Sequence, residues 1–403
     1  MIPELRKKFN REFTQEKYEA FLKDINTSLK YPADFRISET PLFLSDDLKN
    51  KLLKACDDLC KQVTSNEFKL MMKDAIPAHL NIPGETDHPE FFVFDFAICQ
   101  NKSTGEFYPK LIELQGFPTL YGYQYFFEQK VKKHFNIPEN FTSYFNNVTP
   151  EGYIKMLNDV IVAGADPENV ILLEIQPEKQ KTRIDFAATE KLIGISEVCI
   201  SDLIKRGKNL FYKKEGKEIP IERIYNRVIF DELSRTEVKF SFDLKDELNV
   251  KWIPHPNWFY KISKYSLPVL KGDFVPKCFY LRDLTSYPVD LEKYVLKPLF
   301  SFAGLGVKIN VTKQMLDEIK APENYILQEK VNYAPLIETP DEFAKVEIRM
   351  MYFWPARRSD SEGGKTDPIL VNNLIRQSKG KMMGVDFNKN KTWVGGSTAL
   401  HKS

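Results

Sequence analysis

Tyr294-Val-Leu-Lys-Pro-Leu-Phe-Ser-Phe-Ala-Gly-Leu-Gly-Val-Lys-Ile-Asn310 is the stretch around which the rest of the chain is interpreted. The apolar run 294–296 predicts a β-strand that ends at Lys297-Pro298, and residues 307–311 predict a second strand. Between them, the small-residue loop that starts at Ser301 carries Gly304 and Gly306. Glycines let a loop backbone approach a phosphate closely, and Lys297 would add a positive charge to the same anion. An ordinary β-hairpin with a solvated lysine fits this stretch equally well.

A second informative region is a predicted hairpin with strands at 90–98 and 108–116, joined by the turn-rich Asn101-Lys-Ser-Thr-Gly105. A three-residue loop at 103–105 would place Asp95 opposite Glu113 and Val93 opposite Gln115. Since side chains alternate between the two faces of a strand, Asp95, Glu113 and Gln115 would share one face. The opposite face would then hold Phe94, Phe96, Ile112 and Leu114.

Two carboxylates placed opposite each other repel unless a cation compensates them. Magnesium is the natural cation, because it binds a few carboxylate or amide oxygens and keeps its other positions for phosphate and water. The alternative is that one or both acids face solvent. We expect the metal, since nothing else explains two opposed acids on otherwise apolar strands.

The remaining pattern is that of a mixed α/β protein. Residues 1–30 and 45–56 have helical periodicity, as do parts of the aromatic segment 120–165. Residues 169–200 read as strand, helix and strand, a unit that usually forms a parallel sheet with ligand-binding loops at its carboxyl edge. Arg227 follows a further apolar strand and would hold an anion there or pair with a neighbouring acid.

Composition limits the classes of function. The chain has 403 residues, 42% of them hydrophobic, which is enough for two or three folded domains. Its 58 basic and 56 acidic residues give a net charge of +2, so charge offers no argument for a nucleic-acid or membrane partner. The N-terminus lacks the apolar core of a signal peptide, and no apolar run has the length of a membrane span. We therefore expect a soluble cytoplasmic protein.

The order of these motifs resembles the ATP-grasp superfamily of ligases. The resemblance rests on Lys264 in Ile-Ser-Lys-Tyr-Ser-Leu-Pro, on the Val-Leu-Lys297-Pro strand with its loop, on Ile-Leu-Gln-Glu329-Lys-Val, and on the later strands with Arg349 and Arg376. The acidic hairpin precedes the nucleotide lysines here. That order is similar to the circularly permuted branch represented by glutathionylspermidine synthetase, and it covers about residues 90–380 as a pattern.

The resemblance implies a circularly permuted, ATP-grasp-like α/β (α+β) fold of mixed sheets with flanking helices. Residues 1–140 would provide N-terminal helices and the metal-binding hairpin, 141–260 a pre-ATP-grasp-like substrate domain, and 261–403 the nucleotide-binding subdomains. Lys264, Lys297 and the loop with Ser301, Gly304 and Gly306 would contact ATP phosphates. Backbone groups of Gln328, Glu329 and Val331 would form the adenine hinge.

The same resemblance implies that Asp95, Glu113 and Gln115 hold Mg²⁺ and that Arg376 stabilises the transferred phosphoryl group. Gln115 stands where the family has Asn, and Val93 stands where the synthetases carry a catalytic Arg. The role of that Arg would fall to Arg227 or Arg349, or be missing.

The implied activity is an ATP- and Mg²⁺-dependent carboxylate–amine ligase that forms an acyl-phosphate on a small molecule or peptide. Two alternatives stay open, an ATP-dependent phosphotransferase on the same fold and a catalytically inactive nucleotide-binding protein.

Overall fold

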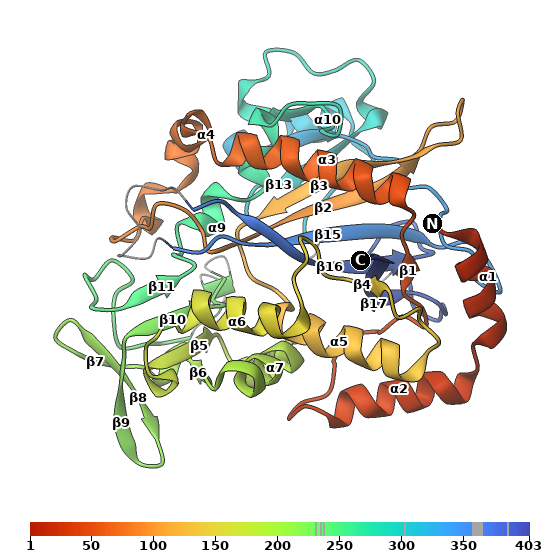
Figure 1. Ribbon diagram of the computed structural model, residues 1–403. Helices are drawn as coiled ribbons and strands as arrows, with labels where there is room; N and C mark the ends of the chain where they lie inside the picture. The colour runs from red at the N-terminus through yellow and green to blue at the C-terminus, as the bar shows by residue number, and fades with distance from the viewer. Residues whose placement is uncertain (230–231, 234–235, 237, 302–303, 357–365, 385–386) are drawn as a thin grey trace.

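The computed structural model describes residues 1–403 except 230–231, 234–235, 237, 302–303, 357–365 and 385–386. Its described strands form five sheets, which helices flank (Figure 1). In the described part of the chain, no helix has the length and apolar character needed to cross a membrane. The helices are α1 (Pro3–Glu12), α2 (Gln15–Thr27), α3 (Asp46–Val63), α4 (Asn66–Met71), α5 (Tyr121–His134), α6 (Pro150–Ile161), α7 (Arg183–Ile193), α9 (Trp258–Lys261) and α10 (Lys313–Asp317).

The largest sheet is antiparallel throughout and has the strand order β17-β16-β15-β2-β3. Helix α3 covers one face, where it packs against Phe92, Phe94 and Phe96 of β2. Helices α5 and α6 cover the other face, on which Phe91 and Val93 of β2 lie, so both faces of the sheet are buried. The strands are β2 (Phe91–Gln100), β3 (Phe107–Gln115), β15 (Lys345–Phe353), β16 (Ile369–Ser378) and β17 (Gly395–Ser397).

The β2–β3 hairpin has the predicted register where it matters for the site. Asp95 lies opposite Glu113 and Val93 lies opposite Gln115. Asp95 is on the face that packs against α5 and α6, and it is completely buried. A buried carboxylate needs hydrogen-bonding or charged partners, so the position of Asp95 in the sheet determines where those partners must lie.

A β-bulge at Ile112 changes the register nearer the turn. Phe96 pairs with Leu111, one residue away from the continuation of the Asp95–Glu113 register. Leu111 is buried beside Phe96, whereas Ile112 is only partly buried. The assignment of Ile112 to the core face is therefore wrong, because the extra residue of the bulge shifts the alternation of side chains.

Lys297 lies in a small antiparallel sheet of order β12-β14-β13, formed by β12 (Cys278–Tyr280), β13 (Tyr294–Pro298) and β14 (Tyr325–Glu329). The second strand predicted at 307–311 is wrong. Only Lys308 bridges to Leu296, with both N–H···O distances 2.9 Å, and the chain bends at 309–310.

The predicted parallel sheet is confirmed, with the order β11-β10-β5-β6. Its strands are β5 (Val170–Glu174), β6 (Ser196–Cys199), β10 (Arg223–Asn226) and β11 (Lys251–Ile253). The chain passes from β5 through α7 to β6, and then returns to the other side of β5 as β10. This reversal creates a topological switch point between β5 and β10, where ligands of open α/β sheets usually bind.

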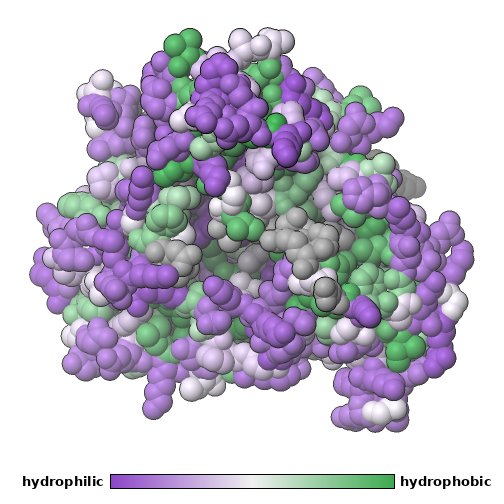
Figure 2. All heavy atoms as spheres, turned by 180° about the vertical axis from the view of Figure 1, so that it is seen from behind, coloured by the Kyte–Doolittle hydropathy of each residue, from purple (hydrophilic) through white to green (hydrophobic). Residues whose placement is uncertain are grey.

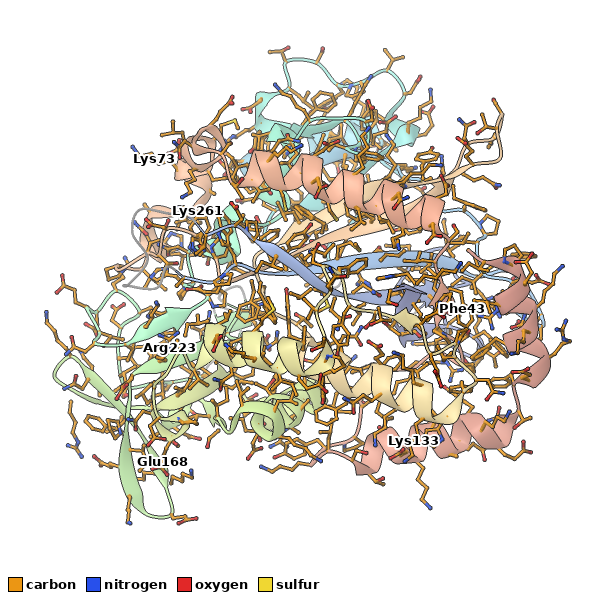
Figure 3. All side chains as sticks on the ribbon, viewed as in Figure 1. Phe43, Lys73, Lys133, Glu168, Arg223 and Lys261 are labelled. Atoms are coloured by element: carbon orange, nitrogen blue, oxygen red, sulfur yellow. The ribbon has the colours of Figure 1, made fainter. Side chains whose placement is uncertain are left out.

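Arg223 anchors this sheet to α6. Its Nε and Nη2 donate to the carbonyl oxygens of Ile161 and Val160 at 2.8 and 3.1 Å (Figure 3). A cationic side chain at the end of a helix satisfies carbonyl groups that have no partner within the helix. A separate three-stranded sheet of order β7-β8-β9 projects outward between β6 and β10 in the chain. Its strands are β7 (Ile204–Arg206), β8 (Asn209–Lys214) and β9 (Lys217–Ile221).

The fifth sheet joins segments that are far apart in the sequence and has the order β1-β18-β4. Strand β1 (Leu42–Phe43) pairs in parallel with β18 (Ala399–Lys402), which pairs on its other side with β4 (Phe141–Thr142) in antiparallel fashion. On the face turned away from Figure 1, hydrophilic residues cover most of the periphery (Figure 2).

Candidate nucleotide site

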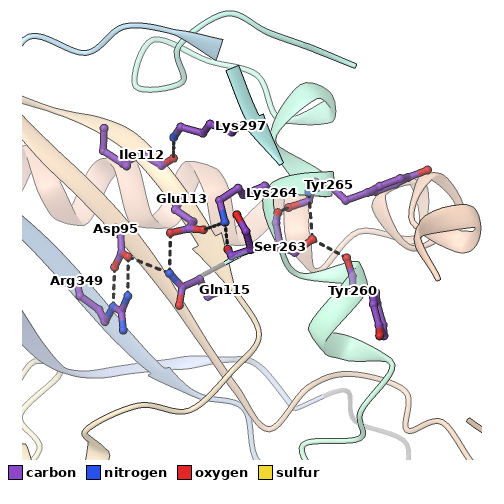
Figure 4. Close-up of polar contacts among 12 residues, drawn as sticks. Asp95, Ile112, Glu113, Gln115, Tyr260, Ser263, Lys264, Tyr265, Lys297 and Arg349 are labelled. Atoms are coloured by element: carbon purple, nitrogen blue, oxygen red, sulfur yellow. Dashed lines mark hydrogen bonds and ion pairs between the residues drawn. The ribbon is translucent and has the colours of Figure 1, made fainter. Parts of the chain in front are cut away.

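Charged side chains cross the central sheet in a row on its α5/α6 face. The direct strand partners are Arg349 and Asp95 between β15 and β2, and Asp95 and Glu113 between β2 and β3. One step along the sheet, Glu347 of β15 is opposite Arg376 of β16. The sheet register therefore brings together acids and cations from four strands. Figure 4 shows three of these side chains, those of Asp95, Glu113 and Arg349.

Asp95 is bound at both oxygens by one guanidinium. Nε of Arg349 donates to Oδ1 and Nη2 donates to Oδ2, each at 2.7 Å. Asp95 is 0% exposed and Arg349 is 8% exposed. Burial alone would lower the pKa of Arg349, but the Asp95 carboxylate raises it, so Arg349 keeps its positive charge.

Arg376 is the more exposed of the two arginines. It pairs with Glu347, and its Nη2 lies 3.4 Å from Oδ2 of Asp95. The Tyr333 hydroxyl donates to the second oxygen of Glu347 at 2.7 Å. The Arg376 side chain retains 41% exposure, so it combines a fixed position with access for a ligand.

Lys264 links the hairpin to the loop after β13. Its Nζ lies 2.7 Å from Oε1 of Glu113 and also donates to the carbonyl oxygen of Ser301. Lys264 begins the 3₁₀-helix η6 (Lys264–Val269), whose N-terminus is capped by the Ser263 hydroxyl. Burial would raise the pKa of Glu113, but Lys264 and Lys297 lower it to about 2.

Gly116 permits this arrangement, a role that the sequence alone did not suggest. Its N–H donates to the Ile262 carbonyl at 2.7 Å, which ties the end of β3 to the segment just before Lys264. A Cβ at position 116 would lie 2.7 Å from Cβ of Ile262 and 2.9 Å from the Trp258 carbonyl oxygen. Only glycine allows so close an approach without a shift of one segment.

Lys297 is buried, and its Nζ donates to the Ile112 carbonyl at 3.2 Å. Ile112 is the extra residue of the β-bulge in β3. Burial is the main cause that lowers the pKa of Lys297, and the neighbouring Lys264 lowers it further, while Glu113 opposes the shift. A second anion near Lys297 would relieve both unfavourable effects.

Residues 302–303 of the predicted phosphate loop lie outside the described residues. Gly304 and Gly306 have φ of 75° and 76°, the left-handed region that glycine tolerates. Between Glu113, Lys264 and Ser301 lies a cavity of about 20 Å³, room for about one water molecule. A nucleotide phosphate would therefore have to displace the Lys264 contacts.

Two buried polar atoms at this site have no partner among the described residues, Oγ of Ser301 and Nε2 of Gln328. Both belong to residues that the resemblance to ATP-grasp ligases implies to contact ATP, although for Gln328 it implies a contact through the backbone. The backbone N–H of Glu329 is bonded to the Lys277 carbonyl, and Val331 follows the end of β14. Unpaired buried polar atoms favour a missing polar ligand, so the chemistry of these residues fits a nucleotide.

The same residues do not fit an open magnesium site in this arrangement. Both Asp95 oxygens are bound by Arg349, and the Glu113 oxygens are bound by Lys264 and by Nε2 of Gln115 at 2.8 Å. The described residues contain no group of three or more His, Cys, Asp or Glu that could hold a metal ion. The metal role of Asp95, Glu113 and Gln115 thus stays a prediction.

Arg227 lies apart from this cluster, at the switch point between β5 and β10. It is 3% exposed, donates to the hydroxyls of Thr119 and Thr182 at 3.2 and 3.4 Å, and its Nε has no partner among the described residues. Its guanidinium lies 4.7 Å from the ring of Phe117, which also lines the cavity beside Lys264. Arg227 therefore forms a second cationic position one aromatic ring away from the first.

Buried acids accompany Arg227. Burial raises the pKa of Glu174 to about 8, although Arg227 opposes the shift. Asp185 accepts the N–H groups of Leu120 and Tyr123, each at 2.9 Å, and so caps α5, whose N-terminal residue has no capping side chain. Helix capping thus accounts for the buried carboxylate of Asp185, whereas no contact among the described residues accounts for the buried Nε of Arg227.

The molecule is a mixed α/β protein whose sheets carry two buried cationic positions. Searches against protein-family models and against curated proteins found no match. Among solved structures, the chain is similar to a glutathione synthetase-like effector (GSS30) from Globodera pallida in its apo form, with 12% identity and a TM-score of 0.55. The match covers 95% of this chain and 96% of the other, so the likeness of fold extends over the whole molecule. The predicted fold class, an α/β (α+β) protein of mixed sheets with flanking helices, is confirmed.

Proposed function

We propose that the chain is an ATP-dependent ligase of the ATP-grasp type that joins a carboxylate to an amine through an acyl-phosphate. The observation that carries this proposal is the convergence of Lys264, Lys297 and Arg376 beside a glycine loop, within a fold similar to that of a glutathione synthetase-like protein. Phosphoryl transfer needs positioning and charge neutralisation more than covalent help from the protein, and this site offers both.

Charge supports an anionic ligand. The cluster contains four cations and three carboxylates, which leaves one positive charge inside a buried site. The cations are Lys264, Lys297, Arg349 and Arg376, and the carboxylates are those of Asp95, Glu113 and Glu347. A polyphosphate would bind Lys264 and Lys297 from the loop side, while Ser301 and Gln328 would supply their unpaired polar atoms.

Arg227 is the proposed anchor for the carboxylate substrate. Its position at the switch point is where the fold favours a ligand, and a carboxylate would satisfy its unpaired Nε. Phe117 separates this anchor from the phosphate cavity, so a small acid or peptide held by Arg227 would direct its reactive end toward the nucleotide.

A second candidate is a nucleotide-binding protein without ligase turnover. The specific observation that favours it is the closed Arg349–Asp95 pair, together with Val93 at the position expected to be Arg. This candidate predicts nucleotide binding with no release of ADP from ATP.

The test has two stages. Thermal unfolding with and without ADP establishes binding, because a ligand at about 100 times its Kd adds about 2.7 kcal/mol to the free energy of unfolding. ADP should stabilise the wild type and Lys313→Met, a control on the exposed surface of α10, but not Lys297→Met. ATP is then supplied with pools of carboxylic acids and with hydroxylamine, which traps an acyl-phosphate as a hydroxamate.

Release of ADP and formation of a hydroxamate, both dependent on one acid, would support the ligase. Binding without ADP release under any acid would leave the second candidate. If ADP stabilises neither the wild type nor the control, both functions are refuted.

A further inference from the structure

We propose that Arg349 takes the place of a divalent cation at Asp95, so that this site binds a nucleoside polyphosphate without Mg²⁺. The inference rests on the proposed nucleotide site and concerns its metal requirement. It departs from the expectation that the hairpin acids hold magnesium.

The geometry of the Arg349–Asp95 pair favours a permanent contact. Two parallel N–H···O contacts of 2.7 Å match the guanidinium to the carboxylate, and neither partner is accessible enough to exchange readily with solvent. The two residues are direct neighbours on adjacent central strands, so the register of the sheet fixes the contact. Removal of one partner would leave an uncompensated buried charge, which makes an exchange for metal costly.

The other two carboxylates, those of Glu113 and Glu347, are also engaged by protein donors. Oδ2 of Asp95 receives further donors from Arg376 at 3.4 Å and from Gln115 at 3.3 Å. Both oxygens of Glu113 and both of Glu347 have donors as well. Magnesium demands nearly ideal octahedral geometry with oxygen ligands, and every oxygen of these three described carboxylates already accepts a protein donor.

The net charge of the cluster also disfavours a metal. The cluster has an excess of one positive charge before any ligand enters, so a bare dication would be repelled. The several negative charges of a nucleotide polyphosphate would be attracted, and Arg376 is exposed enough to meet them. Arginine and lysine side chains would thus supply the neutralisation that a metal usually supplies.

Calorimetric titration of the full chain with ADP, once with excess Mg²⁺ and once with EDTA, tests the inference. The expected ratio of the two Kd values is about 1, since no coupling between metal and nucleotide is expected. Binding that is about tenfold or more tighter with Mg²⁺ would overturn the inference and leave the proposed nucleotide site intact. Absence of ADP binding in both titrations would refute both.

Manganese, detected by electron paramagnetic resonance in the presence of ADP, gives an independent readout. We expect no protein-bound Mn²⁺ signal beyond that of Mn²⁺–ADP in the wild type, and a new signal in Arg349→Met, which frees Asp95. The double variant Asp95→Asn/Arg349→Met should lack the new signal. A wild type that already binds Mn²⁺ through the protein contradicts the inference, and this result does not depend on either variant being folded.

Discussion

Arg349→Met should lower the free energy of unfolding more than any exposed substitution, because it leaves Asp95 charged and buried. Breaking a buried ion pair at one partner usually costs about 3–5 kcal/mol. Asp95 keeps two long contacts after the change, to Arg376 at 3.4 Å and to Gln115 at 3.3 Å. Because these contacts still compensate part of the buried charge, we expect a loss of stability at the lower end of this range, about 3 kcal/mol.

The double variant Asp95→Asn/Arg349→Met removes both charges and should recover most of this loss, to within about 1 kcal/mol of the wild type. Urea unfolding followed by fluorescence and circular dichroism measures both values, provided that the two signals change together. Lys313→Met, which breaks an exposed pair with Asp317, is the control and should cost under about 0.5 kcal/mol. If Arg349→Met costs no more than this control, Asp95 is not held as described.

Three further outcomes follow from the site. Gly116→Ala should displace the segment before Lys264 and weaken ADP binding in calorimetry. Gly105→Ala, in a turn where an added Cβ meets no atom within 4 Å, is the control and should leave ADP binding unchanged. Equal affinities of the two variants for ADP would show that Gly116 does not position Lys264 for the nucleotide. Glu113→Gln should make stability less sensitive to acid. The pKa of Glu113 lies near 2 when folded against 4.5 ordinarily, so its contribution of about 3 kcal/mol is present above about pH 4.5 and is lost as the pH falls toward 2. A wild type and variant with parallel urea-stability curves over this range would contradict that cause. Arg227→Met should raise the concentration of acid substrate needed for half-maximal turnover and leave the Kd of ADP unchanged; a large change in that Kd would place Arg227 in the nucleotide site instead.

The hairpin of the site was predictable because strand alternation is a local rule. A turn and two apolar strands predict a hairpin with Asp95 opposite Glu113, and the structure has this pair. Nearer the turn the observed register differs by one residue from the predicted one, with Gln100 opposite Phe107, and the bulge restores the predicted register at Asp95. The bulge at Ile112 was not predictable by the same rule, because one inserted residue leaves no periodic signal. The Lys297 contact with the Ile112 carbonyl depends on that bulge and was missed with it.

The Arg349–Asp95 pair lay beyond local reasoning for a different reason. The two residues are 254 positions apart, and the pairing of β15 with β2 decides their contact. Glu347 and Arg349 alternate onto one face of β15, but each finds its partner on a neighbouring strand. Which acid each arginine selects follows from strand order, and no segment of the sequence encodes that order by itself.

The interleaved strand order also has a consequence for synthesis of the chain. Strands β2 and β3 are complete at residue 115, yet their neighbour β15 begins only at Lys345. At about 5–20 residues per second, the ribosome needs roughly 12–46 s to supply it. During that interval the inner edge of β2 has no strand partner, and Asp95 has no guanidinium. The nascent hairpin is therefore an open, aromatic-rich edge of the kind that chaperones protect, and the central sheet can close only after β15 and β16 have been synthesised.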